Sequence, residues 1–153
     1  MESHTLIMGL GNVLMGDEGI GVLSIEYLRD KELPEGVDLI DAGTGGFHLL
    51  SLFSQYDHFI LIDAAISSSN PGDVKIMRPR FSSDFPRSLT SHDIGLKDLV
   101  QTAELLGDLP DIHLITINIE DLRDVGIGIS EFLIDSLSEV HGAVLEILGN
   151  LES

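Results

Sequence analysis

Short apolar runs alternate along this chain with segments of helical period, an order that few folds accommodate. Runs rich in β-branched residues and leucine predict β-strands, and here they cover residues 5–10, 37–43, 58–65, 74–78 and 112–119. Strands that alternate with helices are typical of an α/β sheet with right-handed crossover connections. We therefore expect one domain, residues 1–153, built as a three-layer α/β/α structure around a five-stranded sheet.

The segments between these runs space their apolar residues as a helix does. Helices are expected over residues 19–33, 46–56 and 95–107, and from Ser130 onward. Ser130 is a good N-cap residue, and Gly107 suits the position just past a helix end. The apolar residues expected to share one face are Ile20, Leu23, Tyr27 and Leu28 in the first helix and Leu133, Leu137, Val140, Val144 and Ile147 in the last.

One connection departs from the crossover rule. The residues between the third and fourth strands, ISSSNPGD (66–73), are too few for a crossover helix. The fourth strand is therefore predicted to run antiparallel to the others, which makes the sheet mixed. Residues 79–93 are predicted to form a long irregular loop, and loops of this length in compact domains are often functional.

The charge of the chain narrows the choice of ligands. With 26 acidic and 8 basic residues the formal net charge is −18, which disfavours nucleic acid and anionic membranes and favours a cationic ligand or a basic partner. Solubility alone explains such a charge equally well. The chain has no cysteine, which excludes disulfides and thiolate chemistry. This composition, without a signal peptide or a membrane-spanning run, predicts a soluble cytoplasmic protein.

Acidic residues follow three of the predicted strands. Glu18 lies in the turn after the first strand, Asp41 at the end of the second and Asp63 at the end of the third. The first strand is expected between the other two, and ligands of open α/β sheets sit outside the carboxyl ends of such strands. Carboxylates crowded together repel unless a cation or protons intervene. The sequence therefore predicts a site for a metal ion or a cationic group.

A histidine could complete this site. His92, in LTSHDIGL, follows the long loop and precedes a predicted helix. Two carboxylates with one neutral imidazole can hold a divalent transition metal and leave coordination positions open. The residue types alone leave other roles open. His92 could be a surface residue, Asp41 could cap its turn, and Asp17 could favour a helix N-terminus.

Glycines near the strand ends remove side-chain bulk there. Gly9 and Gly11 in GLGNVL allow close backbone approach, as do Gly43 and Gly45 after the second strand. GLGNVL lacks the third glycine of a dinucleotide-binding fingerprint because Leu14 occupies its place. The acidic pair that follows would also repel a pyrophosphate, so a nucleotide site is disfavoured.

Four segments together resemble a known enzyme family. GLGNVLMGDEGIG, DAGTGG, LIDAA and SHDIGL occur in the order and spacing of the nickel–iron hydrogenase maturation endopeptidases, and the resemblance extends over residues 5–147. It implies a five-stranded mixed sheet between helices, with one antiparallel strand, of the phosphorylase/hydrolase-like fold. It also implies removal of a C-terminal extension from the hydrogenase large-subunit precursor after nickel insertion.

The resemblance assigns roles to individual residues. It implies that Glu18, Asp63 and His92 bind nickel, which the precursor carries into the site, and that other divalent transition metals can occupy the site in vitro. It implies that Asp41 is needed for activity, while the nucleophile stays unassigned between an aspartic-type and a metal-dependent mechanism. The residues expected to position the substrate form one turn: Gly43, Thr44 and Gly45.

Two positions depart from the family pattern. Ala42 stands where the family often has glycine, and Ile119 stands where a proline often precedes the glutamate at position 120. These departures bear on loop shape or substrate choice and leave the metal-binding residues unchanged.

Two alternative functions remain open. A phosphoacceptor receiver domain also places an acidic pair after its first strand and an aspartate at the end of its third, around a magnesium ion. Here Asp17 and Glu18 lie too far beyond the first strand for that arrangement, and the last strand lacks the lysine that such domains place at its end. A non-enzymatic nickel-binding chaperone is the second alternative.

Overall fold

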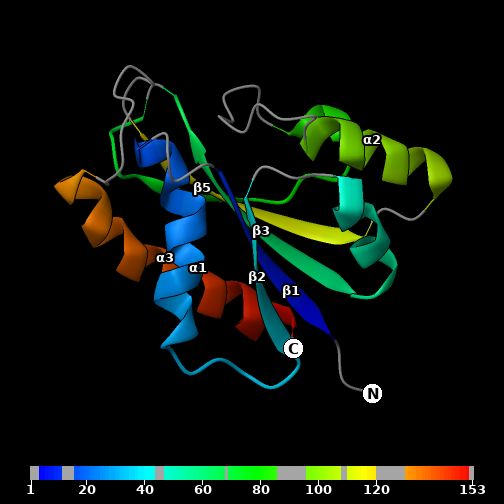
Figure 1. The fold of residues 1–153 in the computed structure, drawn as a ribbon, viewed down its shortest axis with the longest axis horizontal. Coiled ribbons are helices and arrows are strands. Elements are labelled where there is room, and N and C mark those ends of the chain that lie inside the picture. The colour runs from blue at the N-terminus through cyan, green and yellow to red at the C-terminus, as the bar shows by residue number, and fades with distance from the viewer. Residues whose placement is uncertain are drawn as a thin grey trace.

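The structure is a computed structural model that describes residues 4–11, 16–43, 47–67, 69–85, 96–107, 110–119 and 130–151. Helices cover both faces of a mixed sheet (Figure 1). The strands are β1 (Thr5–Leu10), β2 (Val37–Gly43), β3 (His58–Ala65), β4 (Val74–Met77) and β5 (Asp111–Asn118), in the spatial order β2-β1-β3-β5-β4. All neighbours are parallel except β4, which runs antiparallel to β5. The predicted fold class, the position of the first strand between the second and third, and the antiparallel fourth strand are therefore confirmed.

The helical elements follow the predicted order, with one difference in type. They are η1 (Gly16–Gly19), α1 (Ile20–Arg29), η2 (Phe47–Ser54), η3 (Ser82–Asp84), α2 (Leu96–Leu106) and α3 (Glu131–Leu151), where η marks a 3₁₀-helix. The helix predicted over residues 46–56 is the 3₁₀-helix η2, a form typical of short connecting pieces. The predicted loop 79–93 contains the short η3, and its residues 86–93 lie outside the described part of the chain. Gly107 ends α2 as predicted, with φ +76°.

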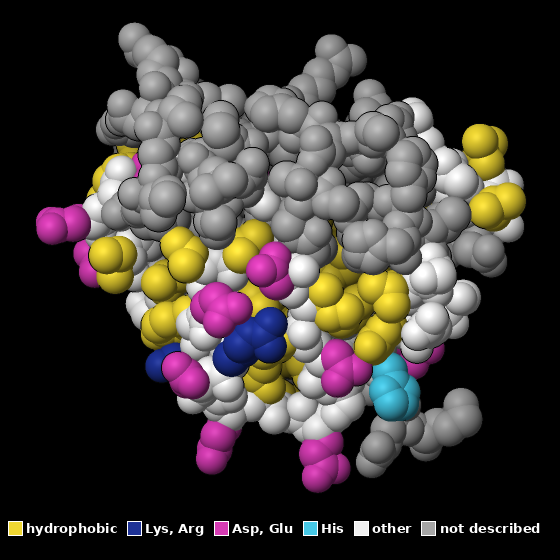
Figure 2. Space-filling model, viewed as in Figure 1, with side chains coloured by type: hydrophobic (Ala, Val, Ile, Leu, Met, Phe, Trp, Pro, Cys, Tyr) yellow, Lys and Arg dark blue, Asp and Glu magenta, His cyan; other side chains and the backbone are white. Residues whose placement is uncertain are grey.

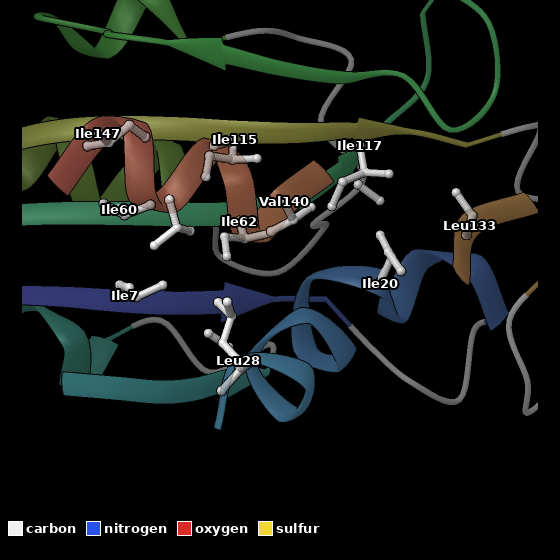
Figure 3. Packing of buried hydrophobic residues seen from close by; sticks show 14 of the residues in the cluster. Ile7, Ile20, Leu28, Ile60, Ile62, Ile115, Ile117, Leu133, Val140 and Ile147 are labelled. Atoms are coloured by element: carbon white, nitrogen blue, oxygen red, sulfur yellow. The ribbon is translucent and has the colours of Figure 1, made fainter. Parts of the chain in front are cut away.

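The two faces of the sheet carry separate apolar clusters, because successive side chains of a strand point to opposite faces. One cluster joins the sheet to α1 and α3, and Figure 3 shows Ile7, Ile60 and Ile115 directed into it. The other cluster lies beneath α2 and η2 and includes Leu6, Phe59, Leu61, Leu114, Val100 and Phe53. Burial on both faces explains why β1, β3 and β5 are almost continuously apolar in sequence.

The buried faces of the helices agree with the sequence at most positions. In α3, Leu133, Val140, Val144 and Ile147 are buried and Leu137 is partly buried. In α1 the buried face contains Ile20, Ser24, Ile25 and Leu28, whereas Leu23 and Tyr27 are only half-buried. Ser24 can be fully buried because its hydroxyl donates a hydrogen bond to the Ile20 carbonyl at 2.8 Å. Apolar periodicity does not recognise a polar residue that is buried in this way. Ser24 was therefore absent from the predicted face of α1.

The connection between β3 and β4 is fixed by Asn118 at the end of β5. The Asn118 side-chain oxygen accepts hydrogen bonds from the Ser67 amide at 2.8 Å and the Ser67 hydroxyl at 3.0 Å. Its amide group donates to the Ser69 carbonyl at 2.6 Å, and the Gly72 amide donates to the Asn118 carbonyl at 2.7 Å. These bonds hold the connection beside β5 as a turn, so that β4 returns antiparallel without a helix.

A buried histidine at the opposite end of the sheet is expected to make the stability of the fold depend on pH. His113 on β5 is 9% exposed, and its Nδ1 has no hydrogen-bond partner among the described residues. Burial lowers the pKa of His113 below its ordinary value of 6.5, although the neighbouring Asp111 carboxylate opposes the shift. The unfolded chain therefore takes up this proton first as the pH falls, so the free energy of unfolding is expected to fall below pH 6.5.

A His113→Gln variant tests this expectation by urea unfolding above and below pH 6.5. It should lose less stability on acidification than the wild type, because glutamine does not titrate. His4→Gln, at an exposed residue, controls for the loss of one imidazole. An unchanged loss of stability in His113→Gln would assign the pH dependence to other groups.

Candidate functional site

Asp41 and Asp63 of the predicted site lie at one edge of the sheet, at the carboxyl ends of two parallel strands, β2 and β3, that flank β1. Gly9 of β1 pairs with Asp41 of β2 on one side and with Ile62 of β3 on the other. Asp63 follows Ile62, so Asp41 and Asp63 lie at nearly the same height with β1 between them. This is the edge at which open α/β sheets bind ligands.

Asp41 and Asp63 belong to opposite faces of the sheet. Asp41 alternates with Val37 and Leu39, which pack toward α1 and α3. Asp63 alternates with Phe59 and Leu61, which pack toward α2. Because side chains alternate along a strand, the two carboxyl groups approach the edge from different layers of helices.

The two acids also differ in exposure. Asp41 is exposed, whereas the side chain of Asp63 is 0% exposed. The Asp63 Oδ1 atom accepts a hydrogen bond from the Ala64 amide at 2.8 Å. Burial of a carboxylate is costly without polar partners or a cation. Contact between Asp63 and an ion outside the chain therefore requires displacement of the atoms that cover it.

The remaining predicted ligands are placed only in part. Glu18 lies in η1, which packs against β3, but its side chain lies outside the described residues. His92 also lies outside them, shortly before α2, the helix that covers the face to which Asp63 belongs. The part of the chain that the structure describes contains no group of three or more His, Asp or Glu residues that could hold a metal ion. The metal-binding triad therefore stays a prediction.

The substrate-positioning turn is described only at its start. Gly43 ends β2, while Thr44 and Gly45 lie outside the described residues.

Ile119, one of the two positions that depart from the family pattern, is 2% exposed and donates a hydrogen bond from its amide to the Ala65 carbonyl at 2.9 Å. A proline has no N–H and could not make this bond. The Ile119 amide therefore supports the last pair of β3 with β5, which joins Ala65 to Asn118.

Two glycines bring α1 onto the sheet at this edge. A Cβ atom on Gly21 would lie 2.2 Å from the Leu10 carbonyl oxygen and 2.4 Å from the Ile62 carbonyl oxygen. A Cβ atom on Gly9 would lie 2.3 Å from the Gly21 carbonyl oxygen. Close approach at Gly9 is thus confirmed, and the matching role of Gly21 was not predicted. Together they hold the start of α1, and η1 before it, against the ends of β1 and β3.

Asp17 makes a long-range contact that the sequence did not reveal. Its Oδ1 accepts the Ser130 amide and its Oδ2 accepts the Ser130 hydroxyl, each at 2.7 Å. Asp17 lies in η1, which leads directly into α1, but its two hydrogen bonds are to the residue before α3. Ser130 lies directly before α3, as predicted, and its hydroxyl donates a hydrogen bond to Asp17.

The face drawn in Figure 2 does not gather the acidic residues of its described part in one place. On the face drawn in Figure 2, Asp and Glu side chains are spread singly, with Lys and Arg side chains among them. None of the helices in the described part of the chain combines the length and the apolarity needed to cross a membrane. In the described part of this face, the distribution is typical of a solvated surface rather than of a concentrated binding patch.

Comparison with known proteins decides the family. A sequence model described as hydrogenase maturation protease (HycI) matches residues 22–147 of the chain. The chain belongs to the hydrogenase maturation protease family. The matched region includes Asp41, Asp63 and His92, whereas Asp17 and Glu18 precede it. Membership of this family makes the chain a hydrolase. It favours the protease function over the alternative of a phosphoacceptor receiver domain.

Individual members of the family are similar over most of this chain. The hydrogenase expression/formation protein HupD of Bradyrhizobium diazoefficiens is 33% identical over 132 residues, which cover 82% of this chain and 67% of HupD. The hydrogenase 2 maturation protease of Escherichia coli is 36% identical over 108 residues, which cover 69% of this chain and 66% of that protease. These alignments thus span about two thirds of each relative.

A solved structure of the family supports the same fold. The hydrogenase maturating endopeptidase HybD from Escherichia coli superimposes with a TM-score of 0.85 at 30% identity, over 96% of this chain and 93% of HybD. The five-stranded mixed sheet is therefore the fold of a hydrogenase maturation endopeptidase.

Proposed function

We propose that this chain removes the C-terminal extension of a nickel–iron hydrogenase large-subunit precursor after nickel has been inserted. The observation that carries the proposal is the placement of Asp41 and Asp63 at the same edge of the sheet, on the two strands that flank β1, in a chain of the hydrogenase maturation protease family. The buried and the exposed carboxyl group suit different tasks. Asp63 is suited to a cation once the atoms that cover it are displaced, and Asp41 is accessible to a polypeptide.

The nickel arrives with the precursor and is recognised by Glu18, Asp63 and His92. In the precursor the metal is held by thiolates, as the family resemblance implies. Carboxylate and imidazole groups compete poorly with thiolates for a metal in a soft-ligand site, and this chain has no cysteine of its own. The protease can therefore contact the nickel without removing it, and contact occurs only after the metal has been loaded.

Peptide cleavage then requires an activated water, stabilisation of the developing oxyanion and a proton donor. Asp41, exposed at the end of β2, is the candidate for proton transfer to or from the reacting groups. The backbone amides of Gly43, Thr44 and Gly45 are candidates for the oxyanion donors. The nickel of the substrate supplies polarisation. The nucleophile is not assigned, and the cysteine-free composition suits a cytoplasmic reaction.

Mass spectrometry of the large subunit tests this function. Candidate large subunits are produced with and without this protein, and with and without nickel. A C-terminal segment is expected to be lost only when both are present, because the metal is the feature recognised. Unchanged masses under all four conditions would contradict the proposal. Nickel binding by the isolated chain, together with unchanged masses, would support the chaperone alternative instead.

A further inference from the structure

Asp17 and Ser130 connect η1, which contains the proposed ligand Glu18, to the start of α3. Asp17 lies in η1, one residue before Glu18, and Ser130 lies directly before α3. Each oxygen of the half-buried carboxylate accepts one hydrogen bond from Ser130, at 2.7 Å from the backbone nitrogen and at 2.7 Å from Oγ. Hydrogen bonds to an ionised acceptor are roughly twice as strong as neutral ones. An anion at the start of a helix is also favoured by the helix dipole.

The contact directs the Asp17 carboxylate away from the face to which Asp63 belongs. Ser130 leads into α3, which packs through Leu133 against the α1 face of the sheet. Asp63 alternates with residues of the α2 face. Asp17 and Asp63 are therefore associated with different faces of the sheet, although Asp17 is the immediate sequence neighbour of a proposed ligand.

We propose that Asp17 is a positioning residue that braces η1, and with it Glu18, against the start of α3 through Ser130. It acts by the geometry of its two hydrogen bonds and not as a metal ligand. The inference rests on the proposed function and adds to it a residue outside the predicted triad. It also explains why two adjacent acids follow the first strand, since one holds the other in place.

Asparagine distinguishes a brace from a ligand at this position. In Asp17→Asn the side-chain oxygen can still accept the Ser130 amide. The new amide group can donate to the Ser130 hydroxyl, which then turns from donor to acceptor. Both contacts are kept while the negative charge is lost. Asp17→Ala removes both contacts, and Ser130→Ala removes only the one made by the hydroxyl.

The experiment measures cleavage of nickel-loaded precursor at a temperature where unfolding curves show each variant to be folded. Asp17→Ala is expected to be roughly 10- to 100-fold slower than the wild type, because displacement of a proposed ligand by about 1 Å costs that much. Asp17→Asn should stay within about threefold of the wild type, and Ser130→Ala should fall between the two. Ser138→Ala on α3, whose hydroxyl contacts only the Asp135 carbonyl among the described residues, is the matched control and should match the wild type.

Hydrogen exchange of the Ser130 amide reports the brace without reference to activity. The amide should be protected in the wild type and in Asp17→Asn and exchange rapidly in Asp17→Ala. Loss of activity in Asp17→Asn equal to that in Asp17→Ala would overturn the positioning role and make Asp17 a charged participant. Full activity of Asp17→Ala, or an unprotected Ser130 amide in the wild type, would overturn it as well. A protected amide in a wild-type chain that leaves the precursor uncut would overturn the proposed function, and the positioning role with it, but not the brace.

Discussion

Asp63→Asn is expected to fold normally and to leave nickel-loaded precursor uncut. Asparagine has the size of aspartate and keeps a side-chain oxygen for the Ala64 amide, which Asp63 binds at 2.8 Å. It removes the negative charge that the proposed recognition of nickel requires. Loss of a group that merely supports a metal ligand costs 10- to 100-fold in affinity or activity, so loss of a ligand is expected to slow cleavage by roughly 100-fold or more.

The measurement is the rate at which precursor loses mass, together with urea unfolding of the variant. His92→Ala removes a second proposed ligand and should have the same effect. Asp57→Asn makes the same chemical change at an exposed residue just before β3, at the end of the strand remote from the site, and should cleave normally. If Asp63→Asn and His92→Ala both process precursor at the wild-type rate, the recognition of nickel by these residues is wrong.

Gly21→Ala is expected to destabilise the fold strongly, although the residue lies in a helix where alanine is normally preferred. The added methyl group would lie 2.2 Å from the Leu10 carbonyl oxygen and 2.4 Å from the Ile62 carbonyl oxygen. Both neighbours are backbone atoms of central strands, so α1 must move away from the sheet. We expect the clash to lower the free energy of unfolding by about 3 kcal/mol. This loss outweighs the gain of about 1 kcal/mol that alanine brings through its higher helix propensity.

The same substitution elsewhere in the chain provides the control. Gly142 lies in α3, and a Cβ atom there would have no neighbour within 4 Å. Gly142→Ala is expected to raise the free energy of unfolding by about 0.5 to 1 kcal/mol. Urea unfolding of both variants should thus give changes of opposite sign. Equal small changes would mean that α1 adapts to the methyl group without loss of packing.

The order of elements was predictable because it depends on short-range features of the sequence. The apolar runs define the strands to within one residue, and the small number of residues between β3 and β4, 66–73, is enough to predict that β4 is antiparallel. Strand order then placed Asp41 and Asp63 at one edge of the sheet. A topological argument of this kind needs no knowledge of side-chain packing.

Features that depend on contacts between distant residues were not predictable. Asp17 and Ser130 are 113 positions apart, and neither residue type predicts a contact with the other. Gly21 was not distinguished from other glycines because only the approach of two strand carbonyls makes it irreplaceable. Alternation also assigns Asp41 and Asp63 to different faces, a detail that strand order by itself does not contain.

This placement on different faces limits how a polypeptide can lie between the two acids. A bound segment that reached both would pass over the end of β1, across the strands rather than along them. Two strand spacings amount to roughly 10 Å, and an extended residue advances about 3.3 Å. About three residues would therefore separate the part of the client that approaches Asp63 from the part that approaches Asp41. The distance between the ends of β2 and β3 would then determine which bond of the client chain lies beside Asp41.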